Sequence, residues 1–259
     1  MTEQPDGQVR FERDGEVAII TLDRPRKLNA YTFAMFEQLM EHFERFDRDP
    51  NLRVAILTGA GEKAFCAGAD LGVTIPKLTD GAPRHFPDIT KRFFSDIYKP
   101  IIAAVNGICI AGGLEMLGGT DLRVCVPHAT FGLGEVRWGI TPAGGSHIRL
   151  PRHIPWAVAM EILLTARPIS AERAYQVGLV NKIVEPDRLM DEALELARVI
   201  ASNAPLAVKA AKEIAVRGMA LEGPFQLEHY ISGRVLMTED AKEGPRAFME
   251  KRQPRYQGR

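Results

Sequence analysis

Hydrophobic and polar residues alternate in blocks over the first two thirds of the chain, and each block has the period of one kind of element. Runs rich in β-forming residues predict strands at residues 17–22, 54–58, 101–105 and 122–126. Between the first two runs, residues 32–48 carry apolar side chains at the spacing of one helix face and predict a helix. Strand-like and helix-like segments in this order are typical of an α/β fold.

The pattern changes in two places. Residues 72–90 hold three prolines among scattered polar residues, which predicts a loop or short irregular helices that shape a substrate pocket. From about residue 186 the periodicity becomes helical. Turn residues divide this part into helices predicted at residues 187–202, 205–217, 225–238 and 240–252.

Composition narrows the class of protein. The 259 residues carry 33 basic and 33 acidic side chains, and this balance favours neither a nucleic-acid partner nor an anionic membrane surface. The three cysteines are not closely paired and form no C-x-x-C motif, so we expect a reducing compartment and no metal site. The polar N-terminus has no signal-peptide pattern, and no apolar run could span a bilayer. We therefore expect a cytoplasmic globular protein.

Two glutamates follow glycine-bearing turns in the middle of the chain. Glu115 comes after Gly112-Gly113-Leu114, and Glu135 comes after Leu133-Gly134. A third turn of small residues lies at 65–70. Such turns can present bare backbone N–H groups to an oxyanion, and two carboxyls can move protons. Apolar neighbours around both glutamates predict partial burial, which raises a carboxyl pKa toward a useful range. The combination suits an enzyme that acts on acyl thioesters.

In the order and spacing of its motifs, the chain resembles the crotonase family, the enoyl-CoA hydratase/isomerase superfamily. The resemblance extends from about residue 8 to residue 256. Its strongest motifs are Asn29-Ala30, Ala64-Phe65-Cys66-Ala67-Gly68-Ala69-Asp70-Leu71, Gly112-Gly113-Leu114-Glu115, Phe131-Gly132 before Glu135, and Gly139-Ile140-Thr141-Pro142. It implies a core of β-β-α turns over residues 1–195 that holds the active site, and a helical C-terminal region over residues 196–259 that forms trimers or dimers of trimers.

The resemblance also implies the chemistry. It places the two oxyanion donors at the backbone N–H groups of Ala69 and Gly112 and the two catalytic carboxyls at Glu115 and Glu135. We assign Glu115 mainly to water activation and Glu135 mainly to the proton at the α-carbon. The implied substrate is a coenzyme A thioester, with no further cofactor and no metal. Its implied contacts are Arg26, Lys27, Ala30, Ala67, Asp70, Leu71, Gly113, Pro142, Phe248 and Lys251, with Arg24 adding to the basic cluster.

Several alternatives stay open. Leu133-Gly134 stands where close hydratase relatives commonly carry Gln-Pro, which leaves the substrate open. An isomerase, a carnitinyl-CoA-type dehydratase and a non-catalytic module of the same fold are the competing functions. We expect Trp138 and residues 72–98 to line the acyl pocket. Arg137 and His147 could touch a polar acyl group, although we favour a surface role for both. Gly59-x-Gly61-x-x-Ala64 after a strand is close to a dinucleotide fingerprint, but the following residues spoil the helix that the fingerprint needs.

Overall fold

The structure, a computed structural model that describes residues 7–80 and 86–259, is built around a six-stranded sheet. In spatial order its strands are β1 (Gln8–Asp14), β2 (Val17–Asp23), β3 (Val54–Gly59), β5 (Ile101–Val105), β7 (Leu122–Cys125) and β10 (Lys182–Ile183). β1 runs antiparallel to β2, and every other neighbouring pair is parallel. The four strands predicted from the sequence are therefore confirmed as β2, β3, β5 and β7.

A second sheet of very short strands crosses the end of the first. Its strands are β4 (Ala64–Cys66), β6 (Ile108–Ile110), β8 (Thr130–Gly132) and β9 (Ile169–Ser170). From β3 onward the chain supplies one strand to the large sheet, one to the small sheet, and then a helix. These helices are α2 (Thr74–Thr79), α3 (Gly112–Gly118) and the 3-10 helix η2 (Glu135–Trp138). This repetition is the β-β-α arrangement that the resemblance implies.

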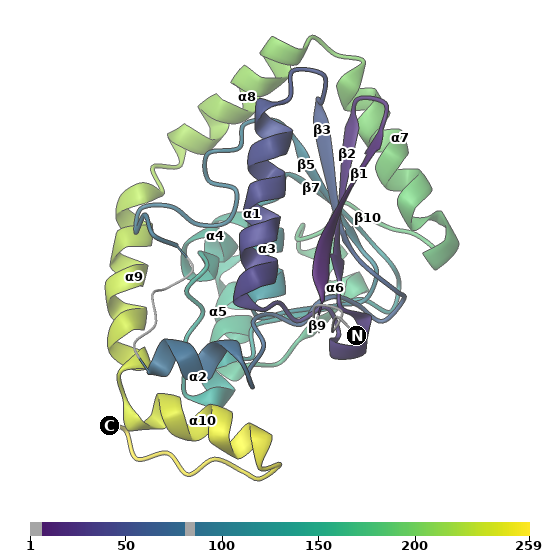
Figure 1. Cartoon of the computed structure of the whole chain (residues 1–259). Helices are drawn as coiled ribbons and strands as arrows, with labels where there is room; N and C mark the ends of the chain where they lie inside the picture. Colours follow the sequence, from purple (N-terminus) through teal and green to yellow (C-terminus); the bar gives the residue numbers. More distant parts are fainter. Residues whose placement is uncertain (1–6, 81–85) are drawn as a thin grey trace, which may run out of the picture.

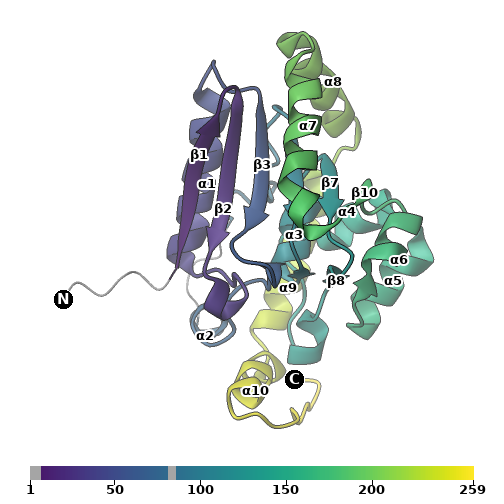
Figure 2. The same cartoon turned by 90° about the vertical axis from the view of Figure 1, so that its right-hand side faces the viewer.

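Helices cover both faces of the large sheet, which explains why its central strands are continuously apolar (Figures 1 and 2). α1 (Phe33–Arg48) packs on β1 and β2 and confirms the helix predicted at 32–48. Its first turn is capped by Thr32, whose side chain accepts a hydrogen bond from the Met35 N–H. α7 (Leu189–Ala201) packs on the opposite face against β3 and β5.

The remaining helices surround these layers. They are η1 (Pro25–Lys27), α4 (Ser146–His153), α5 (Trp156–Thr165), α6 (Ala171–Gln176), η3 (Pro186–Arg188), α8 (Pro205–Gly218), α9 (Glu222–Leu236) and α10 (Glu239–Met249). The four helices predicted after residue 186 are confirmed as α7 to α10, with small shifts at their ends. α2 agrees with the short helices expected within 72–90, but residues 81–85 of that segment lie outside the described part.

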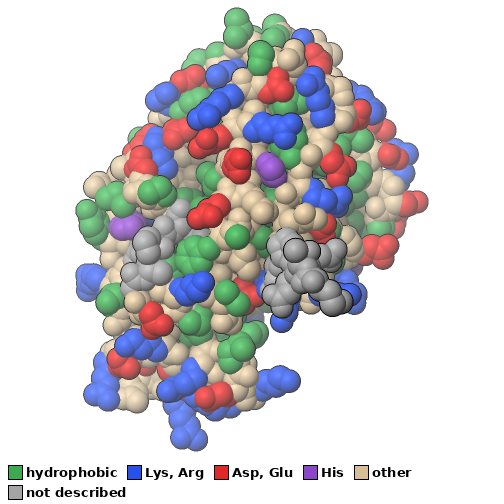
Figure 3. All heavy atoms as spheres, in the orientation of Figure 1, with side chains coloured by type: hydrophobic (Ala, Val, Ile, Leu, Met, Phe, Trp, Pro, Cys, Tyr) green, Lys and Arg blue, Asp and Glu red, His purple; other side chains and the backbone are tan. Residues whose placement is uncertain are grey.

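Charged side chains of both signs are interspersed over the face shown in Figure 3, in keeping with the balanced charge. Hydrophobic side chains reach the surface on the C-terminal helices. α8, described over its whole length, buries none of its residues, and α9 exposes Leu227, Tyr230 and Ile231. Within residues 7–80 and 86–259, no helix is long and apolar enough to cross a membrane.

Candidate active site

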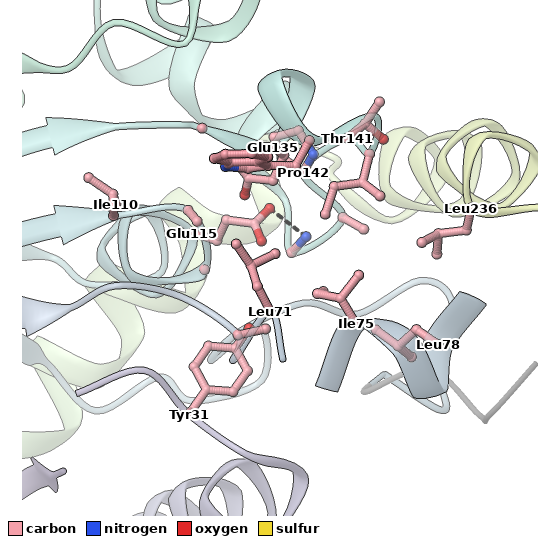
Figure 4. Close-up of a pocket in the computed structure, with 18 of the residues that line it drawn as sticks. Tyr31, Leu71, Ile75, Leu78, Ile110, Glu115, Glu135, Thr141, Pro142 and Leu236 are labelled. Atoms are coloured by element: carbon pink, nitrogen blue, oxygen red, sulfur yellow. Dashed lines mark hydrogen bonds between the residues drawn. The ribbon is translucent and has the colours of Figure 1, made fainter. Parts of the chain in front are cut away.

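One cavity of about 170 Å³ lies where the small sheet, α2, α3, η2 and α9 meet (Figure 4). Its inner end is formed by the turns before α2 and α3 and by the two glutamates. Its outer walls are apolar, with Ile75 and Leu78 from α2 and Leu236 from α9. Trp138 from η2 also lines the cavity. The cavity is therefore polar at one end and suited to a hydrocarbon chain at the other.

The two turns that carry Ala69 and Gly112 touch each other. A Cβ on Gly68 would lie 2.7 Å from the Ala111 Cβ and 2.9 Å from the Gly112 N, and a Cβ on Gly113 would lie 2.3 Å from the Cys66 O. Since real Cβ atoms do not come this close, only glycines allow this approach of the two backbones. The small residues recognised in the sequence are thus needed for contact between the turns.

The N–H groups of both turns are left without partners in their own elements. Gly112 is the first residue of α3, so its N–H has no acceptor within the helix. Ala69 forms a parallel bridge with Tyr31, in which Tyr31 and Asp70 supply the N–H donors. The Ala69 N–H therefore lies on the other side of this short strand.

Ala111, which precedes Gly112, has an unusual backbone. Its φ of 53° and ψ of −130° lie in a region that favours glycine. Holding a side-chain-bearing residue there costs on the order of 1–3 kcal/mol, and such strain concentrates at functional sites. The strained peptide turns the chain sharply from β6 into α3 and fixes the direction of the Gly112 N–H.

Glu115 is buried on α3 and its carboxyl points into the cavity (Figure 4). The backbone N–H of Gly144 donates a hydrogen bond of 2.6 Å to its Oε1. A Cβ on Gly144 would lie 2.7 Å from Glu115 Oε2, so the absence of a side chain there makes room for the carboxyl. The carboxyl is therefore held in one orientation by the backbone of a neighbouring loop.

Glu135, the first residue of η2, faces the same cavity. Its Oε2 is buried and has no hydrogen-bond partner among the residues that the structure describes. Burial raises the pKa of both carboxyls, and the neighbouring charge of Glu135 raises the pKa of Glu115 further. Two such groups titrate as a coupled pair, and the charge of one carboxylate disfavours ionisation of the other.

A buried ion pair supports the cavity wall next to Glu115. Arg92, which lines the cavity, donates from Nε to Glu228 Oε2 on α9 over 2.8 Å, and both side chains are almost fully buried. Its Nη2 donates to the Phe225 O, also on α9. The second oxygen of Glu228 lies 3.2 Å from Nδ1 of His147 on α4. Residues 225–228 therefore fasten α9 to the wall of the cavity.

Comparison with known proteins identifies the family. The family model "Enoyl-CoA hydratase/isomerase" matches residues 12–259. The chain belongs to the enoyl-CoA hydratase/isomerase family. A "Carnitinyl-CoA dehydratase" of Salmonella arizonae is 43% identical over 96% of this chain and 98% of its own length. "Enoyl-CoA hydratase EchA19" of Mycobacterium tuberculosis is 42% identical over 98% of this chain and 97% of its own length.

Solved structures of the family agree with the fold. EchA1_1 from Mycobacterium paratuberculosis has a TM-score of 0.88 and 39% identity, covering 99% of this chain and all of its own. A carnitinyl-CoA dehydratase from Mycobacterium avium has a TM-score of 0.87 and 39% identity, covering 97% of this chain and 99% of its own. The predicted fold and the predicted hydratase or dehydratase class are confirmed by these full-length relatives.

Some of the residues predicted for the site of this enoyl-CoA hydratase/isomerase family member line the cavity, and others do not. Its lining includes Ala67, Ala69, Leu71, Gly112, Glu115, Glu135, Pro142 and also Trp138. The other predicted contacts do not line it: Arg26, Lys27, Ala30, Asp70, Gly113, Phe248 and Lys251. Residues on both sides of the predicted boundary at 195 contribute, since His229 and Leu236 of α9 also line it. The boundary itself stays a prediction.

The basic cluster after β2 is only partly available to a ligand. Arg24 is buried, and its Nη1 lies 2.6 Å from Asp70 Oδ2 and donates to the Ala30 O. Asp70 in turn accepts bonds from the N–H groups of Gly72 and Val73. Arg24, expected to add to the basic cluster, instead joins two segments of the core. Arg26 and Lys27 are exposed on η1.

The structure also tests the alternative interpretations of the sequence. β3 ends at Gly59 and is followed by β4 rather than by a helix, so Gly59-x-Gly61 is not a dinucleotide fingerprint. Arg137 is exposed and donates to the Ala166 O, as expected of a surface residue. His147 is half-buried at Glu228 and does not line the cavity. Among residues 7–80 and 86–259, no cluster of His, Cys, Asp or Glu could hold a metal ion.

Some cavity residues were not recognised in the sequence. Tyr31 directly follows the Asn29-Ala30 motif, and its position beside a motif is the only signal that could have indicated it. Phe86, Arg92 and Phe93 lie within residues 72–98, which were expected as a whole to line the acyl pocket, but no pattern singles out these three residues. His229 and Leu236 lie on α9, far along the chain from the motifs, and reach the cavity only in the folded structure.

Proposed function

We propose that the protein adds water to a 2-enoyl-CoA, or eliminates it from the 3-hydroxyacyl-CoA, with the thioester oxygen held by the Ala69 and Gly112 N–H groups. The observation that carries the proposal is that two buried carboxyls face one cavity beside two touching, glycine-bearing turns. Family membership supports the same reaction class.

Hydration begins at the β-carbon. The reactive form of the pair carries its one proton on Glu135 and leaves Glu115 ionised. A water molecule attacks the β-carbon while the Glu115 carboxylate takes one of the water's protons. The electron pair of the C=C bond moves toward the thioester, and the negative charge develops on the thioester oxygen. Two backbone donors stabilise this enolate, and loss of one such donor typically costs ~3–4 kcal/mol of barrier.

The reaction is completed at the α-carbon. The protonated carboxyl of Glu135 delivers its proton to this carbon, and the enolate returns to a thioester. Glu115 then holds the proton from water and Glu135 is ionised, so one proton must redistribute within the pair before the next turnover. Elimination follows the same steps in reverse. The Gly144 N–H bond to Glu115 supports its role with water, because it fixes one oxygen and leaves the other for the substrate.

The lining of the outer cavity supports an apolar acyl group. Leu71, Ile75, Leu78 and Leu236 contribute hydrocarbon walls. The one cationic side chain among the described lining, Arg92, is already engaged with Glu228 and backbone carbonyls. The coenzyme would extend away from this end, toward the exposed Arg26 and Lys27 and toward the C-terminal Phe248 and Lys251.

The assay follows the ultraviolet absorbance of the conjugated thioester with purified protein: the absorbance falls on hydration of a 2-enoyl-CoA and rises on dehydration of a 3-hydroxyacyl-CoA or isomerisation of a 3-enoyl-CoA. The panel contains straight-chain 2-enoyl-CoA thioesters of increasing length, carnitinyl-CoA and a 3-enoyl-CoA as an isomerase substrate. We expect turnover of at least one 2-enoyl-CoA. Absence of hydration across the panel would reject the proposal, and rapid turnover of the 3-enoyl-CoA alone would replace it with an isomerase.

We also propose a homo-oligomer, a trimer or a dimer of trimers. Its support is the apolar surface of α8 and α9, where Leu206 and Ile214 are exposed to 82% and 73%. Monomeric proteins rarely expose contiguous apolar patches of this kind.

A further inference from the structure

Tyr31 contacts both of the turns that carry the proposed N–H donors. Its own N–H donates to the Gly68 O over 2.9 Å, and its carbonyl accepts the Asp70 N–H over 3.0 Å. These two bonds flank Ala69 on either side and pair it with Tyr31 in a parallel bridge. The backbone of residue 31 therefore fixes the position of the first donor turn.

The side chain of the same residue packs on the second donor turn. A Cβ on Gly112 would lie 2.5 Å from Tyr31 Oη, 2.8 Å from Cε1 and 3.0 Å from Cζ. The edge of the ring and its hydroxyl thus rest directly against the Gly112 Cα. These atoms of Tyr31 are the nearest to that Cβ position, apart from atoms of the two neighbouring residues and of the helix backbone.

The ring is also held from behind. Tyr31 is 5% exposed, and its centroid lies 6.2 Å from that of Phe36 on α1. An aromatic side chain has only two rotatable bonds, so a packed ring fixes the distance between the groups on either side of it. One residue consequently links helix α1, the Ala69 turn and the Gly112 turn in a fixed order.

We propose that Tyr31 is a positioning residue that sets the spacing between the Ala69 and Gly112 N–H groups, and with it the polarisation of the thioester carbonyl. This inference rests on the proposed function, because it concerns the same two donors. Donor geometry matters in such a site because a displacement of about 1 Å can cost ~10²-fold in rate.

The hydroxyl adds no charge to the site. Burial, followed by the nearby carboxyl of Glu115, raises the pKa of Tyr31 well above its ordinary value. The phenol therefore stays neutral wherever the enzyme works. The part of the side chain that the proposal requires is the ring, which Phe reproduces and Leu does not.

The test measures carbonyl polarisation separately from turnover. A conjugated dienoyl-CoA absorbs at longer wavelength when donors withdraw electron density through its carbonyl, so its red shift on binding reports the donor geometry. We expect the wild type and Tyr31→Phe to give the same shift. Tyr31→Leu should lose at least half of it and lower kcat for a 2-enoyl-CoA by ~10- to 100-fold, with KM changed by less than about threefold.

Three results would overturn the inference. Tyr31→Leu could keep both the shift and the rate, or Tyr31→Phe could lose as much as Tyr31→Leu, which would make the hydroxyl responsible. A wild type that binds the dienoyl-CoA without any shift would reject the proposed donors as well, whereas the first two results leave the proposed function intact. If Tyr31→Leu does not fold, Tyr31→Met replaces it with the same expectations, since Met has similar reach without a rigid ring.

Discussion

Burial is the property that fits the two glutamates for proton transfer. An exposed carboxyl near neutral pH is almost always ionised, whereas Glu115 and Glu135 are buried side chains whose pKa values are raised. Their surroundings differ in one respect. Glu115 receives the Gly144 N–H, and Glu135 has a buried oxygen with no partner among the described residues. In the proposed reaction, this difference suits Glu115 to the role of a fixed base and Glu135 to that of a freer acid.

Glu135→Gln tests the acid. Glutamine keeps the size of the side chain and cannot deliver an acidic proton, so turnover should fall by ~10²–10⁴-fold while binding of an acyl-CoA changes little. Steady-state kinetics and calorimetric titration check the two halves of this expectation. Glu161→Gln, a change at an exposed glutamate of α5, is the control and should leave the rate unaltered. An unaltered rate in Glu135→Gln itself would contradict the assigned role.

Glu115→Gln should stabilise the folded protein at alkaline pH. Burial, and then the charge of Glu135, raises the pKa of Glu115 to about 8 in the folded state. The unfolded chain releases this proton nearer its ordinary value, so the wild type loses stability as pH rises from about 4.5 to about 8. Glutamine does not ionise, and its difference from wild type should grow across that window to on the order of a few kcal/mol.

Thermal melting of both proteins at pH 5 and pH 8.5 measures this difference. The variant should melt at the higher temperature at pH 8.5, with a smaller gap at pH 5. An equal difference in melting temperature at the two pH values would show that the surroundings of Glu115 do not raise its pKa.

At the scale of elements, short turns rather than long helices build the reactive end of the cavity. The strained Ala111 peptide starts α3, and the loop that ends at Gly144-Gly145 leads into α4 and holds Glu115. Backbone atoms can approach a carboxyl this closely only where side chains are absent. The precision of the site therefore depends on individual glycines.

Gly144→Ala tests this dependence against a matched glycine. Its Cβ would lie 2.7 Å from Glu115 Oε2 and 2.8 Å from Phe93 Cε2, so the carboxyl must move and turnover should fall by ~10-fold or more. Gly134, beside the other glutamate, has open space where its Cβ would be and an ordinary φ of −91°. Gly134→Ala should therefore change kcat less than twofold. Equal effects in the two variants would refute the steric explanation.

α9 is joined to the cavity through the Arg92–Glu228 pair. Glu228→Ala would leave the Arg92 guanidinium buried beside no acid, and breaking a buried pair in this way typically costs ~3–5 kcal/mol. Denaturant unfolding measures the loss. Glu222→Ala, at the exposed start of the same helix, should change stability by less than about 1 kcal/mol. A loss below about 1 kcal/mol in Glu228→Ala would mean that the pair does not fasten α9.

At the scale of the whole molecule, two layers of helices enclose the large sheet and the C-terminal helices extend beyond it (Figures 1 and 2). The faces of α8 and α9 that do not pack on the core carry large apolar side chains. α9 also supplies Leu236 to the cavity wall. Association through these helices would therefore act close to the proposed site of the acyl group.

Association should depend on Ile214 and Ile231, which are 73% and 50% exposed. Replacing either with Glu places a charge where an interface would exclude water, so the oligomer should dissociate. Light scattering after size exclusion should give a trimer or hexamer mass for the wild type and a smaller mass for the variants. Glu41→Lys on the exposed face of α1 is the control. A monomeric wild type would reject the proposed assembly.

Local features of the sequence determined the layered part of the fold. Long apolar runs predict β2, β3, β5 and β7. A strand that is buried on both faces is apolar at nearly every position, so its own residues are enough to recognise it. The spacing of apolar residues on one helix face predicted α1 and the C-terminal helices, because this period can also be read within a single segment. The strands of the second sheet escaped prediction because two or three residues are too few to show a period.

The groups proposed to react could also be recognised locally, since Glu115, Glu135 and the glycine turns lie within short motifs. What only the tertiary structure decided are the contacts between distant segments. Arg24 meets Asp70 across 46 residues, Arg92 meets Glu228 across 136, and Tyr31 meets Gly112 from another element altogether. No pattern within one segment encodes such pairs, because their geometry exists only after the sheets have brought the segments together.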